Sequence, residues 1–73
     1  MQVNIALLTV TDTRTIETDK SGSILVKKIK EQNHKLIDRK LVKDEKEQIK
    51  KILSDWIKKD IIDVIITTGG TGL

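Results

Sequence analysis

The sequence predicts an α/β fold: a three-layer open sheet with the parallel element order strand–helix–strand–helix–strand and the spatial strand order 2-1-3. Residues 3–10 and 63–68 are nearly continuous apolar runs, as in strands that are covered on both faces. Residues 44–60 carry a clear helical period. Alternating strands and helices indicate a parallel sheet with right-handed crossovers, in which the two most apolar strands lie inside and the remaining strand lies at an edge.

The first half of the chain predicts a buried strand, a polar loop and a helix. Residues 3–10 (VNIALLTV) form the strand, and the segment TDTRTIETD that follows has no apolar period. Residues 20–33 form the helix, with Asp19 or Ser21 as its N-cap and Asn33 ending it in the left-handed conformation. One face of this helix carries Ile24, Leu25 and Ile29.

Residues 35–43 (KLIDRKLVK) alternate loosely between apolar and polar side chains. Ile37 and Leu41 fall on one side of an extended chain, and Asp38 and Lys40 fall on the other. This pattern is typical of a more exposed edge strand.

The second helix has the clearest signal in the sequence. Asp44 and Glu47 have the spacing of a capping box, with an aspartate in place of the usual serine or threonine. The apolar face of the predicted helix, with Trp56 in the core, comprises Ile49, Ile52, Leu53, Trp56 and Ile57. Residues 63–68 (DVIITT) then form the third strand.

Length and composition predict one small domain and exclude several classes. The 73 residues include no cysteine, which excludes disulfides and thiolate metal sites, and no proline or repeat that would indicate a linker. No apolar stretch approaches the roughly 20 residues of a membrane span, and the N-terminus lacks the pattern of a signal peptide. The net charge of +3 comes with one aromatic residue, Trp56, so the lysines indicate solvated helix faces rather than a nucleic-acid surface. We expect a cytoplasmic protein.

The segment VIITTGGTGL places three glycines directly after the third strand. In an open parallel sheet of order 2-1-3, ligands bind at the carboxyl ends of the strands, where the chain leaves strands one and three toward opposite sides. Glycines let backbone N–H groups approach an anion closely, and Thr67, Thr68 and Thr71 add hydroxyls. A phosphate or other oxyanion site is the functional interpretation, and a tight strand-to-helix turn is the alternative. A Walker A loop is excluded because Leu73 follows Gly72.

Two aspartates fall at the same edge of the predicted sheet. Asp12 follows the first strand and Asp44 follows the second. Carboxylates at this edge suit Mg²⁺ held together with substrate phosphates, although a cap at Asp44 and an Asx-turn at Asp12 are structural alternatives. Arg14 either clamps a phosphate or faces water. His34 falls at the opposite edge of the sheet, so we expect no catalytic role for it.

Together, several segments resemble the MoaB/MogA family of molybdenum cofactor biosynthesis proteins. They are LTVTDTR, TDKSG, NHK, LVKDE and IITTGGTG, in the family's order and spacing. The resemblance implies a molybdopterin-binding fold, assembly as homo-oligomeric trimers or hexamers, and adenylylation of molybdopterin with Mg²⁺ and ATP. It implies a catalytic and metal-binding role for Asp44. The cofactor-binding positions that it implies are Thr11, Asp12, Arg14, Ser21, Gly22, Thr68, Gly69, Gly70, Thr71 and Gly72.

The sequence departs from the family pattern after Gly72. Family members continue with an Arg-Asp-x-Thr segment that supplies a second carboxylate. We therefore expect residues 1–73 to be the N-terminal part of a single molybdopterin-binding domain, with the third strand left as an uncovered edge. A non-catalytic pterin-binding or assembly subunit is one alternative. Another is a nucleotide-pyrophosphate domain of the competence/damage-inducible type, although the loops of that family tend to read Gly-Gly-Leu-Gly.

Overall fold

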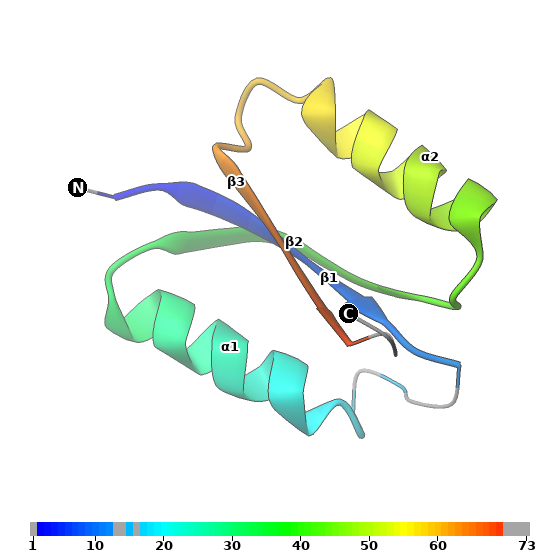
Figure 1. Ribbon diagram of the computed structural model, residues 1–73. Coiled ribbons are helices and arrows are strands. Elements are labelled where there is room, and N and C mark those ends of the chain that lie inside the picture. The colour runs from blue at the N-terminus through cyan, green and yellow to red at the C-terminus, as the bar shows by residue number, and fades with distance from the viewer. Residues whose placement is uncertain (1, 13–14, 16, 70–73) are drawn as a thin grey trace.

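The computed structural model describes residues 2–12, 15 and 17–69. In this part of the chain, three strands alternate with two helices, and Figure 1 shows the sheet between a helix on either side. The elements are β1 (Asn4–Val10), α1 (Lys20–Glu31), β2 (Lys35–Val42), α2 (Lys46–Ile57) and β3 (Val64–Gly69).

The sheet has the strand order β2-β1-β3, and both pairings are parallel. The prediction of a three-layer α/β sheet of order 2-1-3 is therefore confirmed. β1 is central, and five successive residues from Ile5 to Thr9 are buried, as expected for a strand that is covered on both faces. The register of β1 against β2 shifts between Ile5 and Ala6.

One face of the sheet packs against α2. Ala6, Leu8 and Val42 form its core together with Trp56, which is 1% exposed. The indole Nε1 of Trp56 donates a hydrogen bond to Asp38 Oδ2 at 3.1 Å, so the polar end of the buried ring is satisfied by the edge strand. The prediction that Ile57 belongs to this apolar face is wrong: its side chain is 74% exposed, because α2 ends at this residue.

The other face packs against α1. Asp19 is the N-cap of α1, and Asn33 has a φ of 62° just after the helix, as predicted. Ile29 is buried against the sheet. Ile24 is 56% exposed, so the expected apolar face is narrower than the sequence indicated.

The start of α2 differs from the prediction. The N-cap is Glu45, with the extended φ of −125° and ψ of 121°, and its side chain makes no capping hydrogen bond. Asp44 therefore lies before the helix and is not its cap. The physical reason is that the backbone N–H of Asp44 donates to Asp12 Oδ1 at 3.2 Å, which holds Asp44 in the loop.

At the amino-terminal edge of the sheet, hydrogen bonds join segments that are far apart in the sequence. His34 Nδ1 accepts from the Val3 N–H at 3.1 Å, and Asp63 Oδ2 accepts from the Asn4 N–H at 2.9 Å. These contacts give His34 a structural role, as its predicted position indicated. Neither helix in the described part of the chain is long and apolar enough to cross a membrane.

Candidate functional site

The carboxyl ends of the three strands meet at one edge of the sheet. Val10 of β1 is paired with Val42 on one side and with Gly69 on the other. The Thr11 N–H donates to the Val42 carbonyl at 2.8 Å, so the link between β1 and β2 continues one residue past the strands. The predicted residues Thr11, Thr68 and Gly69 therefore lie at a single edge.

The backbone conformation at this edge requires a glycine at position 69. Its φ is +81°, and a Cβ on this residue would collide with the Val10 carbonyl oxygen. A side chain would have to adopt a conformation that L residues rarely take and would push β3 away from β1. This constraint explains the glycine structurally. It also leaves the backbone at the end of β3 free of side-chain atoms, as close approach of a ligand requires.

Asp12 and Asp44 are brought together by the loops that follow β1 and β2. Asp12 Oδ1 accepts the Asp44 N–H at 3.2 Å, and both residues are exposed. Carboxylate oxygens are suitable ligands for Mg²⁺. Among the residues that the structure describes, however, no three His, Cys, Asp or Glu side chains are grouped as a metal site. The described part of this edge therefore offers two exposed acidic residues, Asp12 and Asp44, and no larger set of acidic or histidine ligands.

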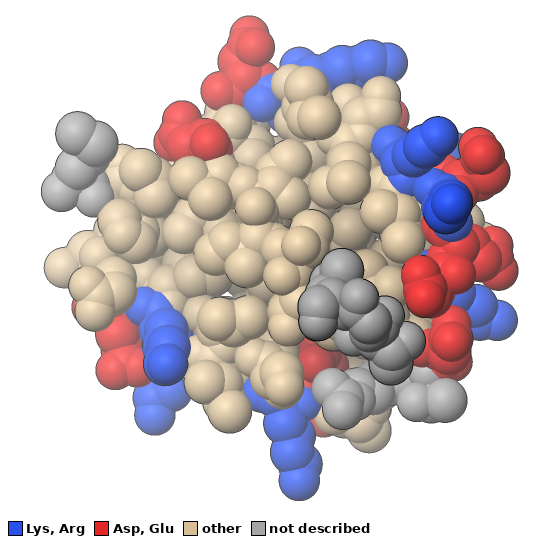
Figure 2. All heavy atoms as spheres, viewed as in Figure 1, with Lys and Arg blue, Asp and Glu red and all other residues tan. Residues whose placement is uncertain are grey.

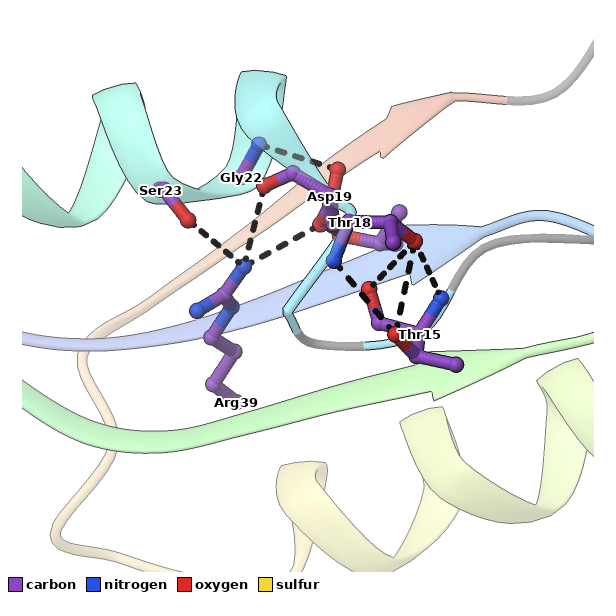
Figure 3. A network of polar contacts seen from close by, with 7 residues as sticks. Thr15, Thr18, Asp19, Gly22, Ser23 and Arg39 are labelled. Carbon is purple, nitrogen blue, oxygen red and sulfur yellow. Dashed lines mark hydrogen bonds and ion pairs between the residues drawn. The ribbon is translucent and has the colours of Figure 1, made fainter.

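A buried polar network joins β1 to β2 and to the start of α1 (Figure 3). Asp19 is fully buried, and its Oδ2 accepts from Thr9 Oγ1 at 2.8 Å while its Oδ1 accepts from the Gly22 N–H at 3.1 Å. The Arg39 guanidinium Nη2 lies 3.3 Å from Asp19 Oδ2 and 3.4 Å from the Asp19 carbonyl oxygen. Asp19 therefore joins β1, β2 and α1 at one point.

The charge of Asp19 is stabilised by these partners. Burial alone would raise its pKa, because a buried carboxylate loses its hydration. Hydrogen bonds from Thr9, from the Gly22 backbone and from Arg39, together with the positive charge of Arg39, outweigh burial and hold the pKa of Asp19 below its ordinary value. The network consequently favours an ionised aspartate.

Two predicted binding residues, Ser21 and Gly22, lie in the first turn of α1. A Cβ on Gly22 would collide with the Asp19 carboxylate and would lie 2.8 Å from Arg39 Nη2. The TDKSG segment is thus explained by packing: its glycine makes room for the Asp19–Arg39 pair. The threonine turn before it, in which the Thr15 N–H donates to Thr18 Oγ1 at 2.8 Å, leads the loop into the helix (Figure 3).

The remaining predicted site residues, Arg14, Gly70, Thr71 and Gly72, lie outside the described residues. The sequence predicted Asp19 only as a candidate cap, and its partners Thr9 and Arg39 were not among the predicted site residues. One signal was present in the sequence. Arg39 falls between Ile37 and Leu41 on the same side of an extended strand, and an arginine on the inner side of a strand requires a buried partner.

Comparisons with known proteins show which family the chain resembles in sequence. A family described as "Probable molybdopterin binding domain" matches residues 6–73. The chain is 43% identical over 72 residues to molybdenum cofactor biosynthesis protein B of Bacillus cereus, covering 99% of this chain and 43% of that protein. It is 41% identical to the protein of the same name in Escherichia coli, over 94% of this chain and 41% of that protein.

A solved structure shows the same fold. The crystal structure of a molybdenum cofactor biosynthesis protein B superposes with a TM-score of 0.93 at 42% identity, over 100% of this chain and 45% of that one. This chain therefore spans less than half the length of the proteins that it matches.

Proposed function

This chain belongs to the family of molybdopterin-binding domains found in molybdenum cofactor biosynthesis proteins, and from this premise we propose that it takes part in the cytoplasmic synthesis of that cofactor by binding molybdopterin at the carboxyl edge of its sheet. The observation that carries the proposal is the match of that family over residues 6–73, which includes every loop at this edge. Relatives named for molybdenum cofactor biosynthesis support the same assignment.

The geometry supports an anionic ligand at this edge. Molybdopterin carries a phosphate, and the edge offers backbone that is free of side-chain atoms at Gly69. Thr68, at the end of β3, contributes a hydroxyl beside it. The Asp19 network holds the start of α1 against β1. A ligand bound between β1 and β3 would meet a pre-organised frame, which lowers the entropy lost on binding.

We further propose that a protein of the relatives' length adenylylates molybdopterin with ATP. The carboxylate of Asp44 would hold Mg²⁺, which when bound neutralises phosphate charge. Asp12 is a positioning residue in this proposal, because its side chain binds the Asp44 backbone and so orients the loop that carries the Asp44 carboxylate. Asp44 is free to contribute this carboxylate because Glu45, rather than Asp44, caps α2.

Anaerobic ultrafiltration of the 73-residue chain with molybdopterin, with and without Mg²⁺, tests the proposal. We expect saturable binding that Mg²⁺ strengthens, and we expect Asp44→Asn to lose the Mg²⁺ effect. Asp55→Asn is the matched control, since Asp55 is an exposed aspartate on α2. Emission from Trp56, the one tryptophan, reports whether each variant is folded. If the folded chain shows no saturable binding, the proposal is wrong.

A non-catalytic pterin-binding role is the second candidate function. It requires only the edge formed by the ends of β1 and β3, where Val10 pairs with Gly69, and it needs no metal-binding role for Asp44. An ATP–pyrophosphate exchange assay on a protein of the relatives' length that contains this sequence separates the two. Exchange that depends on molybdopterin supports the transferase, and binding without exchange supports the second candidate.

A further inference from the structure

Arg39 lies on the edge strand β2, and its side chain is turned toward α1. It pairs with the buried Leu7 of β1, and paired residues carry their side chains on the same face of a sheet. The Arg39 side chain is only 15% exposed, whereas the next residue of the strand, Lys40, is exposed. Figure 2 shows that lysine and arginine side chains otherwise gather at the rim of the visible face. Burial of a charged group is costly unless a partner compensates it, so the contacts of Arg39 explain its position.

One end of the Arg39 guanidinium holds the start of α1 (Figure 3). Nη2 lies 3.3 Å from Asp19 Oδ2, and it donates to the Asp19 carbonyl oxygen at 3.4 Å and to Ser23 Oγ at 3.5 Å. All three acceptors belong to the N-cap and the beginning of α1. The buried Nε of Arg39 has no hydrogen-bond partner in the part of the chain that the structure describes. The guanidinium is therefore oriented by its contacts with α1, and one of its other donors is left unsatisfied.

The start of α1 borders the proposed binding edge. Thr9 of β1 pairs with Thr68 of β3, so the side chains of these two residues lie on the same face of the sheet. Asp19 accepts the hydrogen bond of Thr9 Oγ1 at 2.8 Å, which holds the cap of α1 over the position next to Thr68. The following pair along the two strands is Val10 with Gly69. The first turn of α1 thus lies beside the end of β3, on the face that Thr68 shares.

We propose that Arg39 is a positioning residue for molybdopterin binding: it holds Asp19, and through Asp19 the first turn of α1, in the position beside β3 that the ligand requires. This inference rests on the proposed function. Arg39 acts from a distance, because it pairs with Leu7, three residues before the end of β1, which is about 10 Å along the strand. Its contribution is to fix this arrangement before the ligand arrives, which lowers the cost of ordering it on binding.

Three variants test this role through the dissociation constant of molybdopterin, measured by anaerobic ultrafiltration. Arg39→Met keeps the apolar stem of the side chain but removes its three contacts with α1, and we expect about tenfold weaker binding. Lys40→Met is the matched control. It also removes one positive charge from β2, at an exposed position, and should change the dissociation constant by less than about twofold. Arg39→Lys keeps a positive charge facing Asp19 and should bind with an affinity between those of wild type and Arg39→Met.

Stability is measured on the same samples, because a residue that only supports the fold would lower the free energy of unfolding and leave binding by the folded molecules unchanged. Emission from Trp56 reports the folded fraction, and dissociation constants are compared for folded chain only. Equal dissociation constants for Arg39→Met and Lys40→Met would overturn the inference. If Arg39→Met does not fold, Arg39→Lys takes its place in this comparison, and binding by Arg39→Lys as tight as that of wild type would overturn it.

Hydrogen exchange of the wild-type chain gives a second measurement that needs no variant. A contact that favours ligand binding is itself favoured when the ligand is bound. The Gly22 N–H donates to Asp19 Oδ1, so saturating molybdopterin should slow its exchange more than that of the Asp63 N–H, which donates to the Asn4 carbonyl at the opposite edge. Equal slowing at both amides would overturn the inference.

Failure of this inference and failure of the proposed function give different results. No saturable binding by the folded wild-type chain would show that the proposed function is wrong, and this inference with it. Saturable wild-type binding that does not depend on Arg39 would overturn this inference alone and leave the proposed function standing.

Discussion

Thr9 and Asp19 are hydrogen bonded to each other inside the protein. Thr9 Oγ1 donates to Asp19 Oδ2 at 2.8 Å, and neither residue is more than 1% exposed. Thr9 lies on the central strand and Asp19 caps α1, so this contact holds the start of α1 against β1. The start of α1 therefore depends on a buried pair that was not among the predicted site residues.

Asp19→Asn should strongly destabilise the fold. The substitution keeps an acceptor for Thr9 but removes the charge that Arg39 faces from 3.3 Å. Loss of one partner of a buried ion pair costs about 3 kcal/mol of the free energy of unfolding. Urea unfolding followed by Trp56 emission measures this change, with Asp55→Asn as the exposed control. Equal stability of the two variants would contradict the role given to the network.

Asp19 should also make stability depend on acid pH. Folding lowers the pKa of Asp19 from its ordinary value of 3.8, so the folded chain binds this proton less readily than the unfolded chain. The resulting stability is fully present above that value and is lost as the pH falls through it toward the folded-state pKa. Between about pH 6 and about pH 3, the wild-type chain should lose more unfolding free energy than Asp19→Asn. An equal loss in both would show that other groups carry the effect.

Gly22→Ala should destabilise the protein although the residue is helical. An alanine in place of a helical glycine usually adds about 0.5–1 kcal/mol of stability. At Gly22 the new Cβ would collide with the Asp19 carboxylate, which three hydrogen bonds hold in place. Thermal unfolding shows whether Gly22→Ala lowers or raises the stability of the protein. Ser21→Gly in the same turn should lower stability by the ordinary helical amount, and stabilisation by Gly22→Ala would be inconsistent with the packing.

Gly69→Ala should separate the ends of β1 and β3. The φ of +81° costs an L residue roughly 1–2 kcal/mol, and the Val10 carbonyl oxygen occupies the position of the new Cβ. We expect weaker molybdopterin binding together with lower stability. Val64→Thr, an exposed position at the other end of the same strand, should affect neither. Normal molybdopterin binding by Gly69→Ala would show that binding does not require close approach of the backbone at this position.

Asp44→Asn should leave stability unchanged within about 0.5 kcal/mol, because Asp44 is exposed and Glu45 caps α2. The variant is expected to lose the dependence of molybdopterin binding on Mg²⁺. Urea unfolding and binding measured on the same sample separate the two roles. A clear loss of stability with unchanged Mg²⁺ dependence would assign Asp44 a purely structural role.

Strand order, parallel pairing and both helices could be predicted because they depend on local patterns. Burial of these elements is indicated directly by two apolar runs, at residues 3–10 and 63–68, and by the helical period of α2. Asn33 and Trp56 behave as predicted for the same reason: a left-handed helix end and a large core residue are local preferences.

The features that could not be predicted depend on contacts between distant segments. The cap of α2 moves from Asp44 to Glu45 because Asp12, 32 positions earlier, binds the Asp44 backbone. The pairing of Asp19 with Arg39 joins α1 to β2 across 20 positions. Such contacts follow from the assembled sheet: strand periodicity places Arg39 on the inner side of β2 but does not identify Asp19 as its partner.

The most direct test of the central claim is an anaerobic titration of ¹⁵N-labelled chain with molybdopterin, followed by NMR. The account predicts that chemical shifts change at the carboxyl edge, in Thr11, Asp12, Asp44, Thr68 and Gly69, and that His34 and Asp63 at the opposite edge stay unchanged. Shifts that gather at the opposite edge, or no saturable shifts from a folded chain, would contradict the claim that this edge of the sheet binds molybdopterin.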